Sequence, residues 1–142
     1  MKNNTGFTLV EMMVVIGIVA ILALITVPNI ISWRPKAALS GAARILKADL
    51  ELAKSRAIRD NATVTVTFDT ASGTYRIIDN NGSAIKSRRL TSLNISGTTF
   101  AGNTVTFDRR GRPSSSGDID LTNTSGTVKI VISLLGRVQV AS

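Results

Sequence analysis

The chain opens with a continuous hydrophobic run from Gly6 to Val27, in which Glu11 is the only charged residue. As an α-helix, a run of this length rises roughly 30 Å at about 1.5 Å per residue, enough to cross the hydrocarbon core of a bilayer. The pattern predicts a transmembrane helix over residues 7–29. A carboxylate inside such a segment costs on the order of 2.5–3.5 kcal/mol on insertion, which makes Glu11 a candidate functional residue.

Two prolines, Pro28 and Pro35, follow the hydrophobic run. Each lacks an amide N–H and disfavours helix at the preceding residue, so we expect a kink or local melting across Val27–Arg34. Beyond them, apolar positions recur every three or four residues, which predicts an amphipathic helix over residues 30–61. Its apolar stripe contains Leu39, Ala42, Ala43, Leu46, Leu50, Ala53 and Ala57, and Ile45, Leu52 and Ile58 are expected to widen it.

From residue 62 onward the pattern changes to alternation with a period of two, which is typical of β-strands. The clearest strands are 63–68 and 127–135, the second with Val128, Ile130, Ile132 and Leu134 facing one way. Shorter candidates are 74–79, 84–90, 93–95, 103–107, 117–121 and 138–140. Frequent turns and the absence of strand–helix alternation predict an α+β fold, with the long N-terminal helix packed on an antiparallel β domain at 62–142.

Composition narrows the chemistry. The chain has neither cysteine nor histidine, so it has no disulfide framework and lacks the usual zinc ligands, the commonest general base and the thiol nucleophile. Asp118 and Asp120 alternate along one strand, where a solvent-facing edge explains them better than an acid/base pair. We therefore expect a protein that is not an enzyme, with no metal, no cofactor and no small-molecule substrate.

The N-terminal residues refine the interpretation of the hydrophobic run. No A-x-A-like cleavage site follows Val27, as a secretory signal would require, so the run is expected to be retained. The sequence GFTLVE before an unbroken apolar segment resembles the class III signal of type IV pilins and type II secretion pseudopilins. This resemblance implies that residues 1–6 are a leader, that a prepilin peptidase cuts after Gly6, that Phe7 becomes N-methylated, and that Glu11 helps to position subunits during assembly.

Two further segments resemble the GspH/FimT subgroup of this family: ARILKADLELAKSRAIRDN, at residues 43–61, and TFDRRGRP, at residues 106–113. The resemblance implies a minor pseudopilin or minor pilin, a structural subunit of a pilus-like filament in type II secretion or a type IV pilus. Its partners would be other pilins and the prepilin peptidase. The alternatives are a DNA-binding minor pilin for DNA uptake and a major pilus subunit, with an enzyme tethered by a pilin-like anchor as a more remote one.

A strongly basic balance, 17 lysines and arginines against 9 acidic residues, favours an acidic partner such as nucleic acid, anionic lipid or an acidic protein. The candidate nucleic-acid contacts are Arg109, Arg110, Arg112 and Arg137, with Arg88 and Arg89 as a further basic cluster. Some members of the family bind DNA through a C-terminal GRxR-like loop. Here Gly136 and Arg137 match that loop, but Gln139 replaces its second arginine, so we expect at most weak, non-specific binding.

Localisation follows from the resemblance rather than from charge. It implies a single-pass protein of the bacterial inner membrane whose C-terminal domain is periplasmic, or extracellular after assembly. The positive-inside rule favours the opposite orientation, because Lys2 alone precedes the hydrophobic run whereas Arg34, Lys36, Arg44 and Lys47 follow it.

Overall fold

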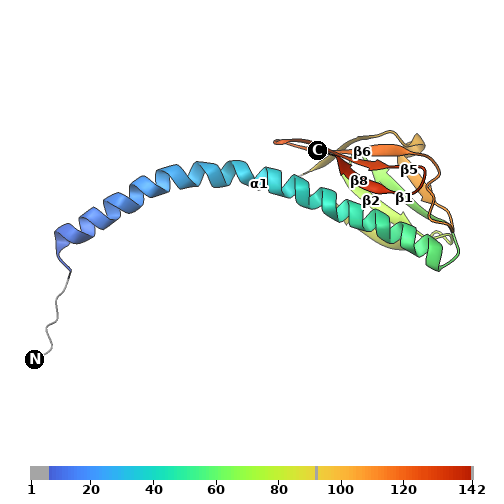
Figure 1. Cartoon of the computed structure of the whole chain (residues 1–142), viewed down its shortest axis with the longest axis horizontal. Helices are drawn as coiled ribbons and strands as arrows, with labels where there is room; N and C mark the ends of the chain where they lie inside the picture. Colours follow the sequence, from blue (N-terminus) through green and yellow to red (C-terminus); the bar gives the residue numbers. More distant parts are fainter. Residues whose placement is uncertain (1–6, 92, 142) are drawn as a thin grey trace, which may run out of the picture. The chain divides into compact units, whose positions relative to one another are not determined.

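The computed structural model of the chain describes residues 7–91 and 93–141, and it describes residues 25–32 by their backbone alone (Figure 1). The predicted leader, with Gly6, lies outside the described residues. The chain divides into two compact units, Met1–Arg34 and Pro35–Ser142. Within the described part of the chain, no helix has both the length and the apolar character needed to cross a membrane.

One helix, α1, extends from Leu9 to Arg59. The helix continues through Val27–Arg34, so the local melting predicted there is wrong, and the alternative of a kink stays a prediction. An internal proline removes one amide donor, and the neighbouring residues can continue the helical hydrogen-bond pattern around it. The helix ends where Asn61 adopts a positive φ of 49° and the Ala62 amide donates to the Ala57 carbonyl at 3.1 Å, a termination that releases the chain toward the first strand.

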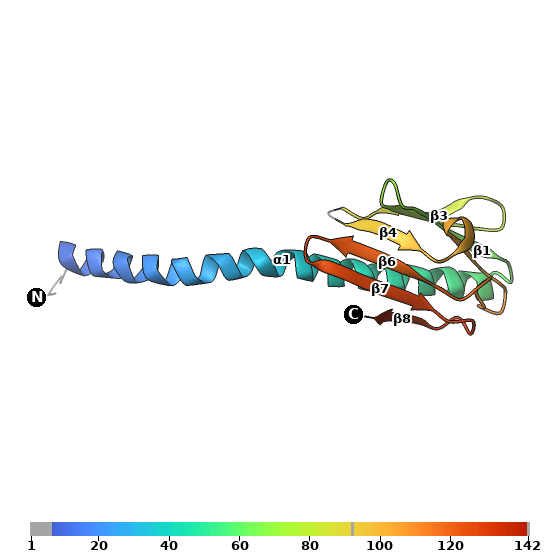
Figure 2. The same cartoon turned by 90° about the horizontal axis from the view of Figure 1, so that it is seen from above.

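The second unit contains two four-stranded sheets (Figure 2). The first has the order β3-β2-β1-β5 and the second has the order β4-β6-β7-β8, and all their neighbouring strands are antiparallel. The strands are β1 Val64–Asp69, β2 Thr74–Ile78, β3 Ala84–Arg89, β4 Asn94–Thr98, β5 Thr104–Phe107, β6 Gly117–Asn123, β7 Gly126–Ile132 and β8 Val138–Ala141, with a short 3-10 helix, η1 Ala101–Asn103, before β5. This confirms the predicted α+β fold.

A single hydrophobic core joins α1 to both sheets. The seven central residues of the predicted apolar stripe are buried, but Ile45, Leu52 and Ile58, which were expected to widen it, are exposed. They pack with the inward-facing residues of the two sheets, among them Val66, Tyr75 and Phe107 from the first and Ile119 and Ile130 from the second. The alternating burial along β1 shows why the strand pattern was readable from sequence: its valines and phenylalanine face the core and its threonines do not.

The last strong strand is shorter than predicted. β7 ends at Ile132, and Leu134 does not continue its buried face but lies in the following turn, where it is exposed. The reason is local. The amide of Gly136 donates to the carbonyl of Ser133 at 2.8 Å, and the amide of Ser133 donates to the carbonyl of Arg137 at 3.0 Å, which closes a tight hairpin loop between β7 and β8.

Candidate functional sites: the N-terminal segment and the arginine pole

The start of α1 is capped by Thr8. Its hydroxyl oxygen accepts the amide hydrogen of Glu11 at 3.2 Å, and its carbonyl accepts the amide hydrogen of Met12, also at 3.2 Å. Thr8 is thus the N-cap, and Glu11 occupies the third helical position, as in a capping box. The predicted methylation site, Phe7, lies immediately before this cap and is exposed. The predicted methylation and assembly residues, Phe7 and Glu11, therefore lie close together at the start of one helix.

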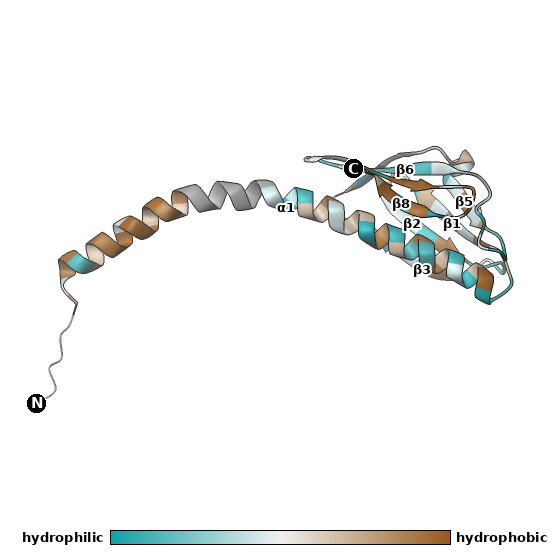
Figure 3. Cartoon of the chain, viewed as in Figure 1, coloured by the Kyte–Doolittle hydropathy of each residue, from teal (hydrophilic) through white to brown (hydrophobic). Residues whose placement is uncertain are grey.

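Glu11 is surrounded by apolar side chains that its own chain leaves uncovered. Leu9, Val10, Met12 and Met13 are all exposed, as are the large hydrophobic residues that follow as far as Leu24. Figure 3 shows this apolar character along the described first part of the helix. Among the described residues, the Glu11 carboxylate has no hydrogen bond and no ion pair. A negative charge near a helix N-terminus is favoured by the helix dipole, but no cation of the described residues pairs with this one.

Four of the predicted nucleic-acid residues come together through two loops built on one plan. The first is Asp108–Arg112, with the sequence DRRGR, and the second is Ser133–Arg137, with the sequence SLLGR. In each, the first residue's amide donates to the fifth residue's carbonyl, and the glycine amide donates to the first residue's carbonyl. The first residue's side chain accepts the amide hydrogen of the final arginine, at 2.8 Å for Asp108 and 3.2 Å for Ser133.

These loops also touch each other and the last turns of α1. Gly136, at φ +74°, is so close to the first loop that a Cβ there would lie 2.3 Å from the Gly111 carbonyl oxygen. Gly111, at φ +75°, has the same constraint against Ile58, whose Cδ1 would be 2.7 Å from an added Cβ. Lys54 donates from Nζ to the Gly136 carbonyl at 2.9 Å. We call the surface formed by the two loops the arginine pole.

The guanidinium groups of the arginine pole are exposed, as predicted for loop residues. When the Gln139 amide oxygen faces Arg137, it accepts from Nε at 3.0 Å and from Nη2 at 2.7 Å, so Gln139 holds Arg137 in one orientation. Hydrogen bonds from the backbone of Arg112 and Arg110, together with the charges of these arginines, lower the pKa of Asp108, which stays ionised inside the first loop. The two loops carry four arginines and one carboxylate, so this pole has a net positive charge.

Arg88 behaves differently from the arginines of the pole. The carboxylate of Asp49, on the buried side of α1, accepts from the Tyr75 hydroxyl at 2.5 Å and from Lys86 Nζ at 2.5 Å, and Arg88 Nε lies 3.4 Å from the same group. Burial and the bond to Asp49 raise the pKa of the Tyr75 hydroxyl, which remains a donor. One arginine of the predicted basic cluster Arg88–Arg89, namely Arg88, is therefore held in an internal ion pair. The sequence pattern did not identify its partner, Asp49.

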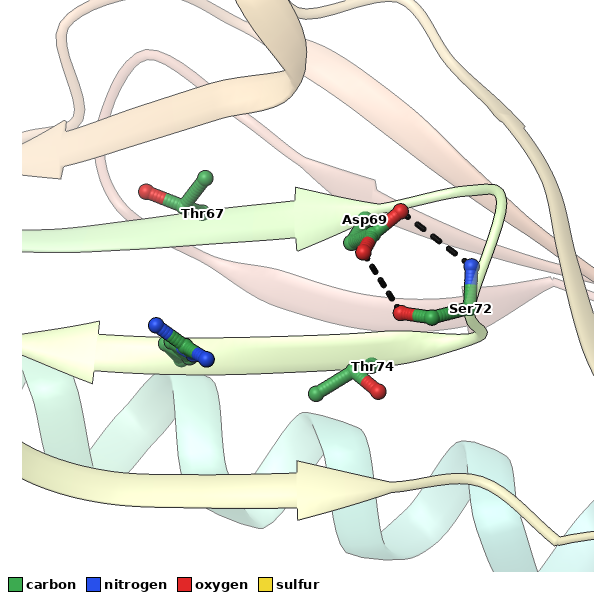
Figure 4. Close-up of a pocket in the computed structure, with 5 residues that line it drawn as sticks. Thr67, Asp69, Ser72 and Thr74 are labelled. Carbon is green, nitrogen blue, oxygen red and sulfur yellow. Dashed lines mark hydrogen bonds between the residues drawn. The ribbon is translucent and has the colours of Figure 1, made fainter.

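The remaining carboxylates on the strands form hydrogen bonds and ion pairs with neighbouring side chains. Asp118 accepts from Thr99 Oγ1 at 2.7 Å and from Lys129, and Asp120 lies 3.6 Å from the same lysine, so the two do not form an acid/base pair. Asp69 closes the β1–β2 turn by accepting from the Ser72 hydroxyl at 2.6 Å (Figure 4). In the described residues, no three acidic side chains gather as a metal site would require.

Comparison with known proteins adds the family. Residues 42–136, well over half of the chain, match the family described as "Type II transport protein GspH". Residues 1–27 match the "Prokaryotic N-terminal methylation motif", which implies a membrane-anchored pilin. The GspH match contains the arginine pole up to Gly136, and the methylation motif contains Gly6, Phe7 and Glu11. The two candidate sites therefore fall in two separately recognisable parts of the sequence.

Individual relatives and solved structures agree with this assignment. The chain is 49% identical over 37 residues to the type IV wide pilus major component PilA4 of Thermus thermophilus, a match that spans 26% of this chain and only 28% of that protein. The fold is similar to that of the type IV minor pilin FimU of Pseudomonas aeruginosa, with a TM-score of 0.64 and 20% identity over 75% of this chain and 90% of that one. It is also similar to the minor pseudopilin EpsH of Vibrio cholerae, with a TM-score of 0.61 and 11% identity over 73% and 96%. The chain thus belongs to the GspH family of type II transport proteins.

Proposed function

We propose that this chain is cut after Gly6, methylated at Phe7 and drawn from the bacterial inner membrane into a pilus-like filament, with its β domain on the periplasmic side. The N-terminal methylation motif supports the processing, and membership of a family of structural pilin-like subunits supports the assembly with other pilins. The observation that carries the proposal is the state of Glu11, an ionisable group on an apolar helix surface without a partner among the described residues.

Glu11 requires a cation once the apolar helix surface is covered. A buried carboxylate is tolerated when it is paired, and an unpaired one is costly. Cleavage after Gly6 creates a new amine on Phe7, at the helix start that Thr8 caps, and a neighbouring subunit would bring such an amine against Glu11. Assembly would then cover the exposed apolar side chains and neutralise the carboxylate in the same step. A subunit without the acid would bury the same apolar side chains but would form no ion pair with its neighbour.

The test compares Glu11→Leu and Glu11→Gln with Met13→Leu, a matched change at an exposed apolar position of the same helix. All three variants should be processed and retained in the membrane normally. Loss of one partner of a desolvated charge pair costs 2–5 kcal/mol or more, so incorporation of both Glu11 variants into filaments should fall at least about tenfold in a crosslinking assay. Met13→Leu should assemble as wild type. Undiminished incorporation of Glu11→Gln would reject the pairing with Phe7.

Processing is tested separately. Coexpression with a prepilin peptidase should shorten the chain by residues 1–6 and leave a methylated Phe7, as measured by intact mass. A bulky residue at Gly6 should block the cut, because that residue immediately precedes the bond to be cleaved. A chain that keeps Met1 in the presence of active peptidase would remove the processing step from the proposal.

A second candidate function is weak, non-specific binding of DNA at the arginine pole, which the gathering of four exposed arginines supports. Contacts with phosphates release counterions, so the affinity should lie around 10⁻⁴–10⁻⁶ M at physiological salt and fall steeply as salt rises. Arg137→Ala should reduce it only modestly if the charge is shared with Arg109, Arg110 and Arg112. A submicromolar affinity that survives 200 mM salt and collapses with Arg137→Ala would instead make DNA uptake the first function.

A further inference from the structure

The two loops of the arginine pole place different side chains in equivalent positions. Each loop has the same pattern of internal hydrogen bonds, so the second and third positions of the first loop correspond to those of the second. The first loop carries Arg109 and Arg110 at these positions, and the second carries Leu134 and Leu135. The final position is an arginine in both. The pole therefore presents an arginine pair and a leucine pair on matching frames that contact each other.

The leucine pair is unusually exposed. Leu134 and Leu135 are 62% and 83% exposed, more than the other large hydrophobic side chains described in the second unit, such as Ile45 at 41% and Leu52 at 38%. The loop that carries them is firmly held by its internal hydrogen bonds, by the Gly136–Gly111 contact and by Lys54. Figure 2 shows the β7–β8 hairpin turning at the end of the unit where α1 also ends. The structure thus holds two leucines in water beside four cations.

We infer that the arginine pole is a docking surface for an anionic phospholipid membrane, into whose interface Leu134 and Leu135 insert. The leucines lie at the tip of a hairpin, so a rigid occupant would need a pocket shaped to receive them, whereas a bilayer interface admits them without one. Arginines beside the inserted residues would then contact the phosphates and negative headgroups of the same surface.

Nucleic acid explains the arginines but not the leucines. Phosphates give no favourable contact to an aliphatic side chain, and base stacking uses aromatic rings, of which the two loops have none. An acidic protein segment would suit the charge, but it would also have to provide a cavity for a protruding pair. A membrane has negative headgroups for the arginines and an apolar interior for the leucines. It can accept both pairs without a pocket of matching shape.

The experiment uses the full chain held in nanodiscs of phosphatidylcholine, mixed with separate vesicles that float in a density gradient. Vesicles of phosphatidylcholine with 30% phosphatidylglycerol should carry the nanodiscs upward, and vesicles of phosphatidylcholine alone should not. The double change Leu134→Ser with Leu135→Ser should weaken binding at least about tenfold, because two aliphatic side chains lose their apolar environment. The double change Arg109→Gln with Arg110→Gln should weaken it about fivefold for each charge lost. Empty nanodiscs provide the background.

A matched variant separates insertion from general stickiness. Ile45→Ser with Leu52→Ser also removes two exposed aliphatic side chains, but from the side of α1, and should leave binding unchanged. The absence of cysteine permits a single environment-sensitive label at Leu135→Cys, whose emission should shift to the blue with anionic vesicles, and at Thr124→Cys, in the β6–β7 turn, where it should not. Unfolding temperatures of the Leu134, Leu135, Arg109 and Arg110 variants should equal that of the wild type, because these residues are exposed. The variant of Ile45 and Leu52, which are more than half buried, is used at a temperature where its own unfolding curve shows it to be folded.

Three outcomes would overturn the inference. The first is no flotation with anionic vesicles. The second is flotation that the arginine changes abolish and the leucine changes leave intact, which would mean adsorption by charge without insertion. The third is tight binding of duplex DNA that the leucine changes weaken as strongly as the arginine changes, which would assign the pole to nucleic acid. None of these depends on cleavage at Gly6 or on Glu11, so failure here and failure of filament assembly remain distinguishable.

Discussion

Helix α1 carries two carboxylates in opposite situations. Asp49 is 5% exposed and has partners from two strands of its own chain, namely the Tyr75 hydroxyl, the Lys86 ammonium and the Arg88 guanidinium. Glu11 lies in the first turn, on an exposed apolar surface, and no described residue of the chain neutralises it. Both are acids among hydrophobic side chains. Folding pairs Asp49, whereas no residue in the described part of the chain pairs with Glu11.

This difference separates stability from assembly. A buried charge with internal partners contributes to the stability of its own domain. Removing it is destabilising because its former partners are left buried without a counter-charge. An exposed charge without partners contributes little to folding, but it becomes costly if a neighbouring apolar surface covers it unpaired. The same helix therefore holds one acid that fixes the helix on its sheets and one that we expect to select a neighbour.

The largest expected effect comes from breaking the satisfied site. Asp49→Ala leaves the Tyr75 hydroxyl buried without its acceptor and leaves Lys86 and Arg88 without their anion. We expect the free energy of unfolding of the second unit to fall by about 3 kcal/mol, the lower end of the range for a buried pair, because both cations can still reach solvent. Denaturant unfolding followed by circular dichroism measures it.

The control for this prediction is Glu51→Ala, two residues further along α1, where the carboxylate is partly exposed and its ion pair with Lys54, at 3.8 Å, is loose. That change should alter the free energy of unfolding by less than about 0.5 kcal/mol. If Asp49→Ala were as mild as Glu51→Ala, the buried network would be incidental to stability and the contrast with Glu11 would lose its meaning.

A smaller effect is expected from removing one partner only. Tyr75→Phe deletes the hydroxyl that donates to Asp49 while keeping the buried ring, so packing is preserved. Asp49 retains Lys86 and Arg88, and we expect a loss of about 1.5 kcal/mol, typical of a hydrogen bond to a charged group. A loss equal to that of Asp49→Ala would mean that the tyrosine, rather than the cations, satisfies the carboxylate.

Much of this architecture was predictable from sequence because it depends on local periodicity. The helical stripe from Leu39 to Ala57 and the alternation in β1 each report one buried face. Leu134 was misplaced because the alternation of β7 continues by chance into the turn, although Gly136 three residues after Ser133 repeats the spacing of the Asp108 loop. Sequence spacing could also have flagged Asp49, which lies three residues after Leu46 on the buried stripe.

What sequence could not supply are contacts between distant segments. That Lys86 and Arg88 reach Asp49, and that Gly136 packs on Gly111, depends on how the two sheets fold against α1. The two basic clusters look alike in the sequence, but one is partly consumed by an internal carboxylate and the other faces solvent. Distinguishing them requires the tertiary structure.

Asp118 provides an intermediate case between the two acids, since it is partly exposed and has one cationic partner, Lys129. Hydrogen bonds from Lys129 and Thr99 lower the pKa of Asp118 below its ordinary value of 3.8. Its stabilising effect is therefore present above that pH and is lost as the pH falls through the lowered pKa. Between pH 5 and about pH 3 we expect the wild type to lose more stability than Asp118→Asn, by less than about 1 kcal/mol because the pair is exposed to solvent. Parallel acid-unfolding curves would contradict this.

The smallest expected effect on stability is that of changing Glu11, the unpaired acid in the comparison with Asp49. Glu11→Gln should leave the free energy of unfolding of the second unit unchanged within about 0.5 kcal/mol, because Glu11 belongs to the first unit and its carboxylate has no hydrogen bond or ion pair among the described residues. Measured on the preparation used for the filament assay, the variant should therefore be fully folded and yet poorly incorporated. Asp49→Asn should give the reverse, a destabilised domain whose folded fraction still enters filaments at the wild-type rate. If Glu11→Gln lowered stability as Asp49→Ala does, Glu11 would have a partner within its own fold, and its role in selecting a neighbour would no longer follow from being unpaired.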